Sequence, residues 1–145
     1  MAADSIELII VTPERQLLRE RAVEVSMPGA DGYLGILPGH APLMTELGVG
    51  ELTYRSTAGS APESLAIDRG FAEVLPDRVT ILAETAELAA HIDLARAEAA
   101  LQRAEKRLAS QDANLDWDRA SIALQRALIR IQVARKHRGV PTPTL

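Results

Sequence analysis

The chain has 145 residues, a formal net charge of −4 and no cysteine. This length suits one ordinary domain, or a small domain with an appendage. Without cysteine the chain has no disulfide, no zinc site built from cysteine and no thiol nucleophile. Its four aromatic residues are too few for a platform on which single-stranded nucleic acid stacks, so we expect no nucleic-acid partner.

Charge and hydropathy add two expectations. Residues 1–90 carry 14 acidic and 6 basic side chains, a balance of −8, whereas residues 91–145 have a balance of +4. This asymmetry predicts two regions with different partners. The first residues, MAADSIELIIVTP, lack the basic start of a secretory signal, and no apolar run approaches the ~20 residues that span a bilayer. We therefore expect a soluble intracellular protein.

The first part of the chain predicts short strands. Turn sequences such as PGADG, PGHAP, TAGSAP and LPDR separate apolar or alternating runs, a spacing typical of an antiparallel sandwich or barrel. The clearest strand pair is joined by Pro76, Asp77 and Arg78. The predicted runs are Ile6–Val11, Gln16–Leu18, Val23–Met27, Tyr33–Leu37, Glu51–Arg55, Ser64–Ile67, Phe71–Leu75 and Val79–Leu82.

The second part predicts two long helices. The 62 residues from Asp77 to Arg138 contain neither glycine nor proline, and two heptad patterns fall within them. Asp93 and Asp116 can cap the helix starts, and Gly139 can end the second helix. The short connection SQDANLD makes the helices antiparallel neighbours. Alanine holds half of the seam positions and buries little apolar area, so the hairpin should be marginally stable and detachable. The seam residues are Leu94, Ala97, Leu101, Ala104, Leu108, Trp117, Ala120, Leu124, Ala127, Ile131 and Ala134.

His40 is the first candidate site residue, because it follows the turn residues Pro38 and Gly39. Catalysis would need partners, and the neighbourhood offers Thr45 and Glu46 but no second histidine and no order of serine, histidine and aspartate. Three interpretations remain open. His40 and Glu46 could serve a small hydrolase, the histidine could bond backbone carbonyls in a turn, or the loop could form a rigid contact surface.

Arginine is the second signal, with 14 arginines against 2 lysines. Arginine suits planar, bidentate recognition of phosphate or carboxylate. Most of the helical arginines have no acidic residue three or four positions before them. They could form two solvated faces, clamp an anion between the helices or dock on an acidic partner. The spacing places on one face of each helix Arg96, Arg103 and Arg107, and then Arg119, Arg126 and Arg130.

Three segments identify a family. GYLGILPGHAPL, AIDRGFAEVLPDRVTILAETAE and HIDLARAEAALQRAEKRL resemble the epsilon subunit of bacterial F-type ATP synthase, and the likeness runs from about Ile6 to Lys136. The block from Gly35 to Leu43 is highly specific. The resemblance implies an α+β, mainly β fold: an N-terminal ten-stranded antiparallel β-sandwich followed by a C-terminal antiparallel two-helix hairpin. We expect the sandwich in residues 1–87 and the hairpin in residues 88–145.

The resemblance also implies a function without catalysis. Members of the family are part of the central rotor stalk, where the sandwich binds the gamma subunit and the ring of c subunits. We therefore expect no catalytic residue and no metal, and a peripheral location at the cytoplasmic face of the bacterial plasma membrane, held there through the complex. The implied interface residues are Gly29, Ala30, Asp31, Gly32 and Tyr33 toward the ring, and Pro38, Gly39, His40, Ala41 and Pro42 near gamma.

The hairpin would carry regulation. In relatives it extends into the alpha/beta headpiece and hinders ATP hydrolysis, and some relatives bind ATP through an I/L-D-x-x-R-A motif. No cofactor is required, but the match implies regulatory ATP; a free-standing ATP-sensing module is the alternative. The TPTL tail and the TAGSAPES loop have no assigned role. The residues that match the nucleotide site are Glu87, Ile92, Asp93, Arg96, Ala97, Arg103, Arg126 and Arg130.

Overall fold

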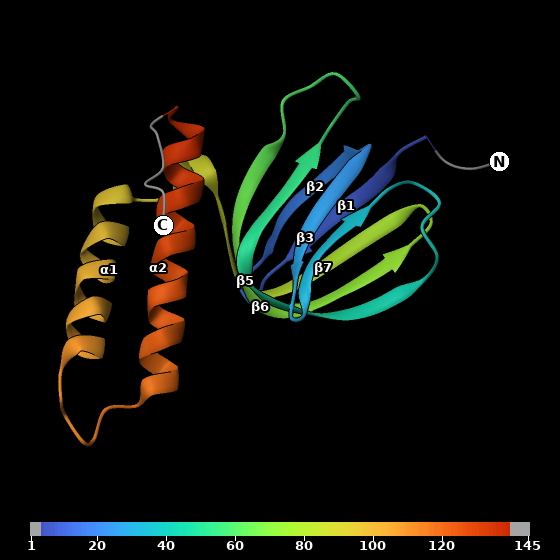
Figure 1. The fold of residues 1–145 in the computed structure, drawn as a ribbon. Helices are drawn as coiled ribbons and strands as arrows, with labels where there is room; N and C mark the ends of the chain where they lie inside the picture. The colour runs from blue at the N-terminus through green and yellow to red at the C-terminus, as the bar shows by residue number, and fades with distance from the viewer. Residues whose placement is uncertain (1–3, 140–145) are drawn as a thin grey trace. The chain divides into compact units, whose positions relative to one another are not determined.

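The computed structural model describes residues 4–139 and has the expected α+β composition. These residues fall into two compact units, the first up to Glu87 and the second from Leu88 onward. Strands form the first unit and helices the second (Figure 1). The TPTL tail, residues 142–145, lies outside the described residues.

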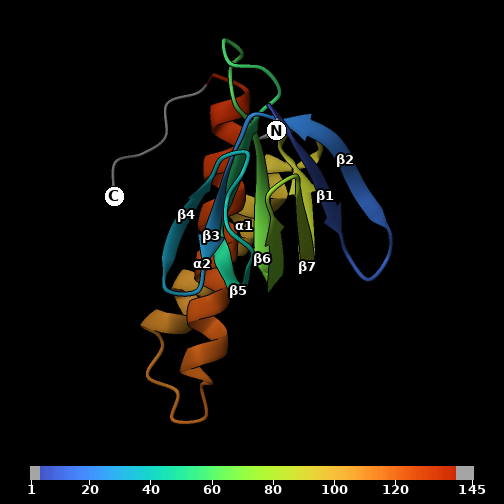
Figure 2. The ribbon, with the colours of Figure 1, turned by 90° about the vertical axis from the view of Figure 1, so that its right-hand side faces the viewer.

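Within residues 4–139, seven strands form one hydrogen-bonded sheet in the order β2-β1-β7-β6-β5-β3-β4, so β2 and β4 are its edge strands (Figure 2). Strands β6 and β7 are neighbours joined by Pro76 and Asp77, which confirms the strand pair predicted there. The strands are β1 Ile6–Val11, β2 Gln16–Ala22, β3 Glu24–Gly29, β4 Gly32–Ile36, β5 Leu43–Arg55, β6 Glu63–Leu75 and β7 Arg78–Leu88.

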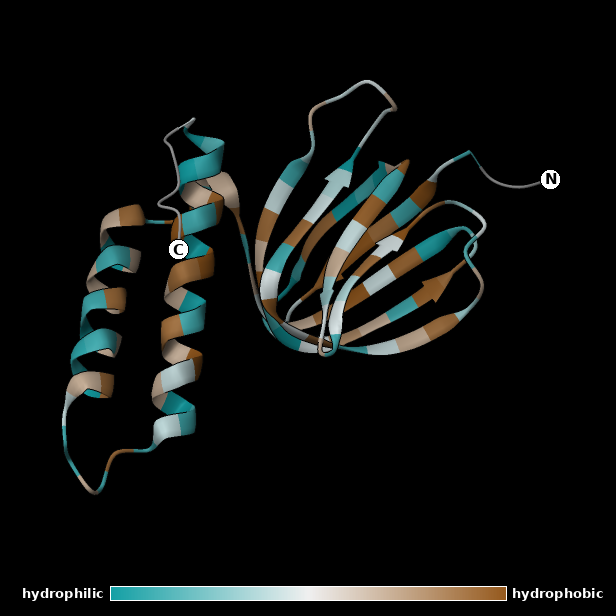
Figure 3. Cartoon of the chain, in the orientation of Figure 1, coloured by the Kyte–Doolittle hydropathy of each residue, from teal (hydrophilic) through white to brown (hydrophobic). Residues whose placement is uncertain are grey.

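Alternation along each strand builds the core of the sheet. In β1, Ile6, Leu8 and Ile10 are fully buried, while the residues between them are half-buried. Successive side chains of a strand point to opposite faces, so this pattern fixes which face is buried. Figure 3 shows the same alternation of hydrophobic and hydrophilic residues along several strands.

The expected ten-stranded antiparallel sandwich is wrong in two details: residues 4–139 form seven strands rather than ten, and one pair of strands is parallel. Strands β5 and β6 each run for 13 residues and β7 for 11, and the sheet curves along them where shorter strands were expected (Figure 1). Ser64–Ile67 and Phe71–Leu75, predicted as two runs, are one strand because the Arg69–Gly70 step bends β6 without ending it. In addition, β1 and β7 pair in parallel rather than antiparallel, although they lie far apart in the sequence.

The second unit is a two-helix hairpin, as predicted. A 3-10 turn, η1 (Ala89–His91), precedes α1 (Leu94–Ala109) and α2 (Trp117–His137). The Asp93 carboxylate accepts a hydrogen bond from the Arg96 N–H at 3.1 Å, and Asp116 caps α2 in the same way through Arg119. After α2, Gly139 has φ +69°, the left-handed conformation that ends many helices.

Small residues form most of the helix seam. Ala97, Ala104, Ala120 and Ala127 are buried, whereas the seam leucines are half-buried. Trp117 departs from the predicted seam: it is exposed, because it is the first residue of α2 and the seam begins one turn later.

Two contacts fix the register of the helix pair. The Arg135 guanidinium pairs with Glu98 at 3.0 Å, and Arg138 donates to the Ile92 carbonyl at 3.3 Å. Both contacts join the start of the first helix to the end of the second, so the helices are antiparallel.

Candidate functional site

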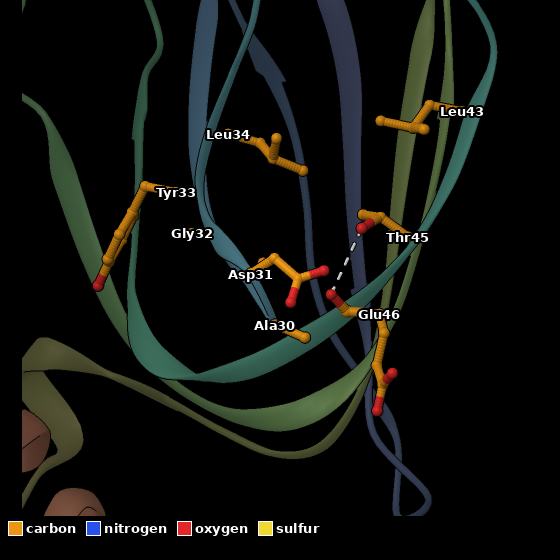
Figure 4. Close-up of a pocket in the computed structure, with 9 residues that line it drawn as sticks. Ala30, Asp31, Gly32, Tyr33, Leu34, Leu43, Thr45 and Glu46 are labelled. Carbon is orange, nitrogen blue, oxygen red and sulfur yellow. Dashed lines mark hydrogen bonds between the residues drawn. The ribbon is translucent and has the colours of Figure 1, made fainter.

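The tip of the β3–β4 hairpin borders a cleft of about 320 Å³. The hairpin contacts β5 through the Ala30 N–H, which donates to the Glu46 carbonyl at 2.9 Å. Figure 4 shows the Asp31 and Glu46 side chains beside this tip, with Thr45 hydrogen-bonded to the Glu46 carbonyl. Among the described residues that line it, the cleft thus brings together two carboxylates and no cationic side chain. Its lining residues are Gly29, Ala30, Asp31, Gly32, Tyr33, Leu34, Leu43, Thr45 and Glu46.

Two glycines allow close approach at this hairpin, Gly29 across its own turn and Gly50 between β5 and the hairpin. A Cβ on Gly29 would lie 2.6 Å from the Gly32 carbonyl oxygen, and one on Gly50 would lie 2.5 Å from the Pro28 Cβ. The Tyr33 hydroxyl closes this contact by accepting a hydrogen bond from the Glu51 N–H at 3.0 Å. The predicted ring-facing segment is therefore a two-residue turn with its flanking strand ends, held to β5 by hydrogen bonds of Ala30 and Tyr33.

The His40 loop is a second fixed surface. Its backbone is closed by a bond from the His40 N–H to the Leu37 carbonyl at 3.1 Å, and the Gly39 N–H donates to the Pro76 carbonyl at 2.8 Å. Gly39 adopts φ +87°, which favours glycine. The His40 Nδ1 lies 2.7 Å from the Ala41 carbonyl oxygen, so it donates to a backbone carbonyl in a turn.

These contacts favour two of the three interpretations of His40, as a turn residue and as part of a contact surface. His40 is absent from the residues lining the cleft that holds Glu46. Within residues 4–139, no three histidine, aspartate or glutamate side chains are arranged to hold a metal ion. Over the same residues, no helix is long and apolar enough to cross a membrane.

Three residues of the nucleotide motif have structural contacts of their own. Ile92 and Ala97 are buried, and the Asp93 carboxylate caps α1. Helix capping and packing therefore account for these three side chains without a ligand. Glu87 lies in β7 of the first unit, and Arg96 is exposed in the first turn of α1.

Six of the helical arginines share one flank of the hairpin. Each of the six directly precedes a seam residue, as Arg103 precedes Ala104 and Arg126 precedes Ala127. In an antiparallel helix pair, residues directly before seam residues lie on the same side of both helices. Glu98 and Arg135 directly follow seam residues, and their ion pair lies on the opposite side of the hairpin. The register places Arg103 at the level of Arg126–Arg130. We call this surface the arginine flank: Arg96, Arg103, Arg107, Arg119, Arg126 and Arg130.

The sequence reasoning missed an exposed apolar patch on the sheet. Met44, Phe71 and Leu82 are 64%, 55% and 50% exposed. Phe71 lies opposite Glu46, and Met44 lies opposite Glu73 in the β5–β6 ladder. The two-residue connection from β6 to β7 places Phe71 beside Leu82. The sequence did contain a signal for this patch. Side chains alternate between the two faces of β6, and Phe71 lies on the same exposed face as Glu73, whereas Ala72 and Val74 lie on the buried face. We call Met44, Phe71 and Leu82 the face patch.

A charged bridge beside this patch was also missed. The Arg69 guanidinium lies 3.1 Å from the Asp68 carboxylate and 3.1 Å from that of Glu84, so it connects β6 to β7. Arg69 adopts φ +47°, which is uncommon for a residue other than glycine. A Cβ on the next residue, Gly70, would collide with the Leu82 carbonyl oxygen. The Arg69–Gly70 step therefore forms a tight bend of β6 against β7.

Comparison with known proteins places both units in one family. The family model described as "ATP synthase, Delta/Epsilon chain, beta-sandwich domain" matches residues 5–89. The model described as "ATP synthase, Delta/Epsilon chain, long alpha-helix domain" matches residues 91–135. The two matches follow one another along the chain, and together they cover both structural units.

Individual relatives agree with the family models. The ATP synthase epsilon chain of Koribacter versatilis is 55% identical over 106 residues, 73% of each chain. That of Syntrophobacter fumaroxidans is 51% identical over 134 residues, 92% of this chain and 98% of the relative. A chain of the Euglena gracilis mitochondrial ATP synthase (OSCP/F1/c-ring) shares the fold, with a TM-score of 0.74 at 24% identity over 86% of this chain and 78% of that chain. The resemblance inferred from the three sequence segments is confirmed, and the chain belongs to the ATP synthase delta/epsilon chain family.

Proposed function

We propose that the chain is the epsilon subunit of an F-type ATP synthase, a non-catalytic part of the central stalk that joins the gamma subunit to the c ring. The observation that carries this proposal is the match of both units, in order, to the two domains of the family. Relatives named epsilon chain, similar over more than nine tenths of both lengths, support it. The subunit would lie at the cytoplasmic face of the bacterial plasma membrane, held there by its partners.

The sheet offers two surfaces suited to stalk partners. The hairpin tip, with Asp31 and Glu46, would face polar loops of the c ring. The His40 loop and the face patch would contact gamma, because exposed apolar side chains rimmed by polar residues mark protein interfaces. Loops held on a firm scaffold commonly carry binding residues, which suits a subunit that connects two partners.

Reconstitution tests this proposal. Membranes that contain ATP synthase stripped of its own epsilon subunit should retain the added chain after washing. The amount retained should be proportional to the amount of gamma subunit present. Phe71→Glu should weaken retention tenfold or more, because it places a charge in the face patch. Ala58→Glu, on an exposed loop outside the proposed interfaces, is the matched control and should be retained like the wild type. Failure of the wild-type chain to be retained would overturn the assignment.

We also propose that the hairpin inhibits ATP hydrolysis. Residues 91–145 have a charge balance of +4, and the arginine flank gives that charge one surface for docking on acidic parts of the alpha/beta headpiece. ATP synthase carrying a chain that ends at Ala90 should hydrolyse ATP faster and still synthesise it. The difference should shrink at high salt, because screening weakens exposed charge pairs. Equal hydrolysis with and without the hairpin would refute an inhibitory role.

ATP binding by the arginine flank is a second proposal. It is supported by the register, which brings Arg103 level with Arg126 and Arg130 on one side of the helix pair. A phosphate contact from an arginine contributes about 1.5–3 kcal/mol. Because about 1.4 kcal/mol corresponds to a tenfold change, Arg126→Ala should weaken ATP binding tenfold or more in calorimetry of the whole chain.

Arg119→Ala is the matched control for the ATP site. Arg119 lies on the same flank but seven residues before Arg126, roughly 10 Å along the helix at 1.5 Å per residue. Its loss should leave ATP binding within twofold of the wild type. Equal losses from the two variants would indicate general electrostatic attraction, and no heat at millimolar ATP would rule out the site.

A further inference from the structure

The two edge strands of the sheet differ in their protection. At one end of the sheet, β2 exposes Arg19, Glu20 and Arg21, and charged side chains on an edge discourage another strand from pairing with it. At the other end, β4 has the sequence GYLGI and carries no charged residue (Figure 2). An edge without charges is the kind that natural proteins normally cover.

The register of the β3–β4 hairpin shows which backbone groups face outward. Gly29 and Gly32 pair across a two-residue turn, and the pair that closes such a turn exchanges backbone hydrogen bonds. The next pair is therefore of the non-bonded kind, and it joins Tyr33 to Pro28, a residue without an N–H. Gly35, two residues farther on, is opposite Ser26 in a second non-bonded pair. The N–H and C=O groups of Tyr33 and Gly35 thus point away from β3.

The side chains leave this edge accessible. Tyr33 and Leu37 are each 60% exposed, and Gly35 is exposed with nothing within 4 Å of the place a Cβ would take. Apart from the bonds within the β3–β4 ladder, no backbone hydrogen bond of Tyr33 or Gly35 is present among residues 4–139. The edge therefore combines unpaired peptide groups with exposed apolar side chains.

We propose that an extended segment of the gamma subunit pairs with β4 and adds an eighth strand to the sheet. Strand addition to a sheet edge uses the outward peptide groups for affinity and neighbouring side chains for specificity. Naming gamma rests on the proposed function, since β4 leads away from the ring-facing hairpin tip, of which Tyr33 is the last residue, and into the His40 loop that is proposed to contact gamma. A second copy of this chain is disfavoured, because residues 1–90 have a charge balance of −8 and Asp31 and Glu46 lie beside the edge. The gamma segment should accordingly carry basic residues next to its apolar ones.

Hydrogen exchange at single amides tests the pairing without any substitution. In the isolated full chain, the amides of Tyr33 and Gly35 should exchange rapidly, whereas those of Leu34 and Ile36 should be protected by β3. In the assembled ATP synthase, Tyr33 and Gly35 should slow by a hundredfold or more. Assembly without this slowing would overturn the strand addition and leave the proposed function intact. Protection in the isolated chain that grows with its concentration would also overturn it, by indicating self-pairing.

Two substitutions at one position provide a second test. Gly35→Pro removes the outward N–H, and proline is tolerated on an edge strand where the N–H faces solvent. Gly35→Ala keeps the N–H and has room for its methyl group. After thermal melting shows both variants folded, the proline variant should be retained at least tenfold less on stripped ATP synthase membranes, and the alanine variant within twofold of wild type. Equal retention of both folded variants would overturn the proposal.

Discussion

The two units of the chain bury different kinds of side chain. The sheet encloses fully buried Leu8, Ile10, Leu52, Leu65 and Ile81, whereas the centre of the helix seam consists mostly of buried alanines. At roughly 25 cal/mol per Å² of apolar area, a buried leucine contributes far more than an alanine. The comparison indicates that apolar burial stabilises the sheet more than it stabilises the hairpin. A small margin of stability suits an element that moves between two states.

Truncating one leucine in each unit should show the difference in stability between the sheet and the hairpin most clearly. Leu65→Ala should lower the free energy of unfolding of the sheet by about 2–5 kcal/mol, the range for a fully buried leucine. Leu101→Ala should cost the hairpin only about 1 kcal/mol, since Leu101 is half-buried. Urea unfolding followed by circular dichroism reports both units, and Trp117 fluorescence reports the hairpin. Equal losses would contradict the difference in packing.

The helix caps should matter more to the hairpin than any single seam alanine. Asp93→Ala and Asp116→Ala each remove the acceptor of one helix-end N–H and should cost about 1 kcal/mol each. Asp93→Asn should cost less, because asparagine also caps helices. Asp118→Ala is the control: Asp118 lies in the first turn of α2 but caps nothing, so a few tenths of a kcal/mol are expected. If Asp118→Ala lowered hairpin stability as much as the two cap variants do, negative charge near the helix start, and not capping, would explain the losses.

The caps also show what local sequence can predict. Asp93, Asp116 and Gly139 act within one turn of their own helix, so the sequence around them contains the whole interaction. The strand β1 was predicted with its observed bounds for the same reason, because its alternation is complete within six residues. The pair of helices followed from heptads and a short connection. These features depend on neighbours close in the sequence.

The features that were missed depend on distant residues. The parallel pairing of β1 with β7 joins segments about 70 residues apart, and no local pattern contains it. The continuity of β5 and β6 depends on how the sheet curves. The contact surface was predicted at the hairpin tip and the His40 loop, but Met44 and Leu82 join Phe71 only through the ladder and the β6–β7 turn. The motif from Ile92 to Ala97 is fully present, and packing and capping explain its Ile92, Asp93 and Ala97 but not the exposed Arg96.

Alkaline pH should weaken the sheet through one tyrosine. Burial, with smaller effects from the Glu20 and Glu63 carboxylates, raises the pKa of Tyr54 above its ordinary value of 10.0. The folded chain therefore holds this proton more tightly than the unfolded chain does. The stabilisation is complete below the unfolded pKa and is lost as pH rises through the folded pKa. Tyr54→Phe should flatten the fall in unfolding free energy above pH 10, and a fall as steep as that of the wild type would exclude Tyr54 as its cause.

The smallest expected effect is that of the ion pair between the two helices. Glu98 and Arg135 lie 3.0 Å apart with side chains 43% and 25% exposed, so water and salt screen their attraction. Glu98→Gln should lower hairpin stability by about 0.5 kcal/mol, and the loss should shrink in 1 M salt. Glu84→Gln provides the sheet counterpart, because Arg69 and Glu84 are more exposed at 41% and 61%, and its cost should be smaller still. Thermal melts of both variants at two salt concentrations measure the difference. If Glu98→Gln cost as much as Leu65→Ala, this partly exposed ion pair would contribute as much as a core leucine. The hairpin would then be held together by charge, and its description as a marginal unit packed by alanines would be wrong.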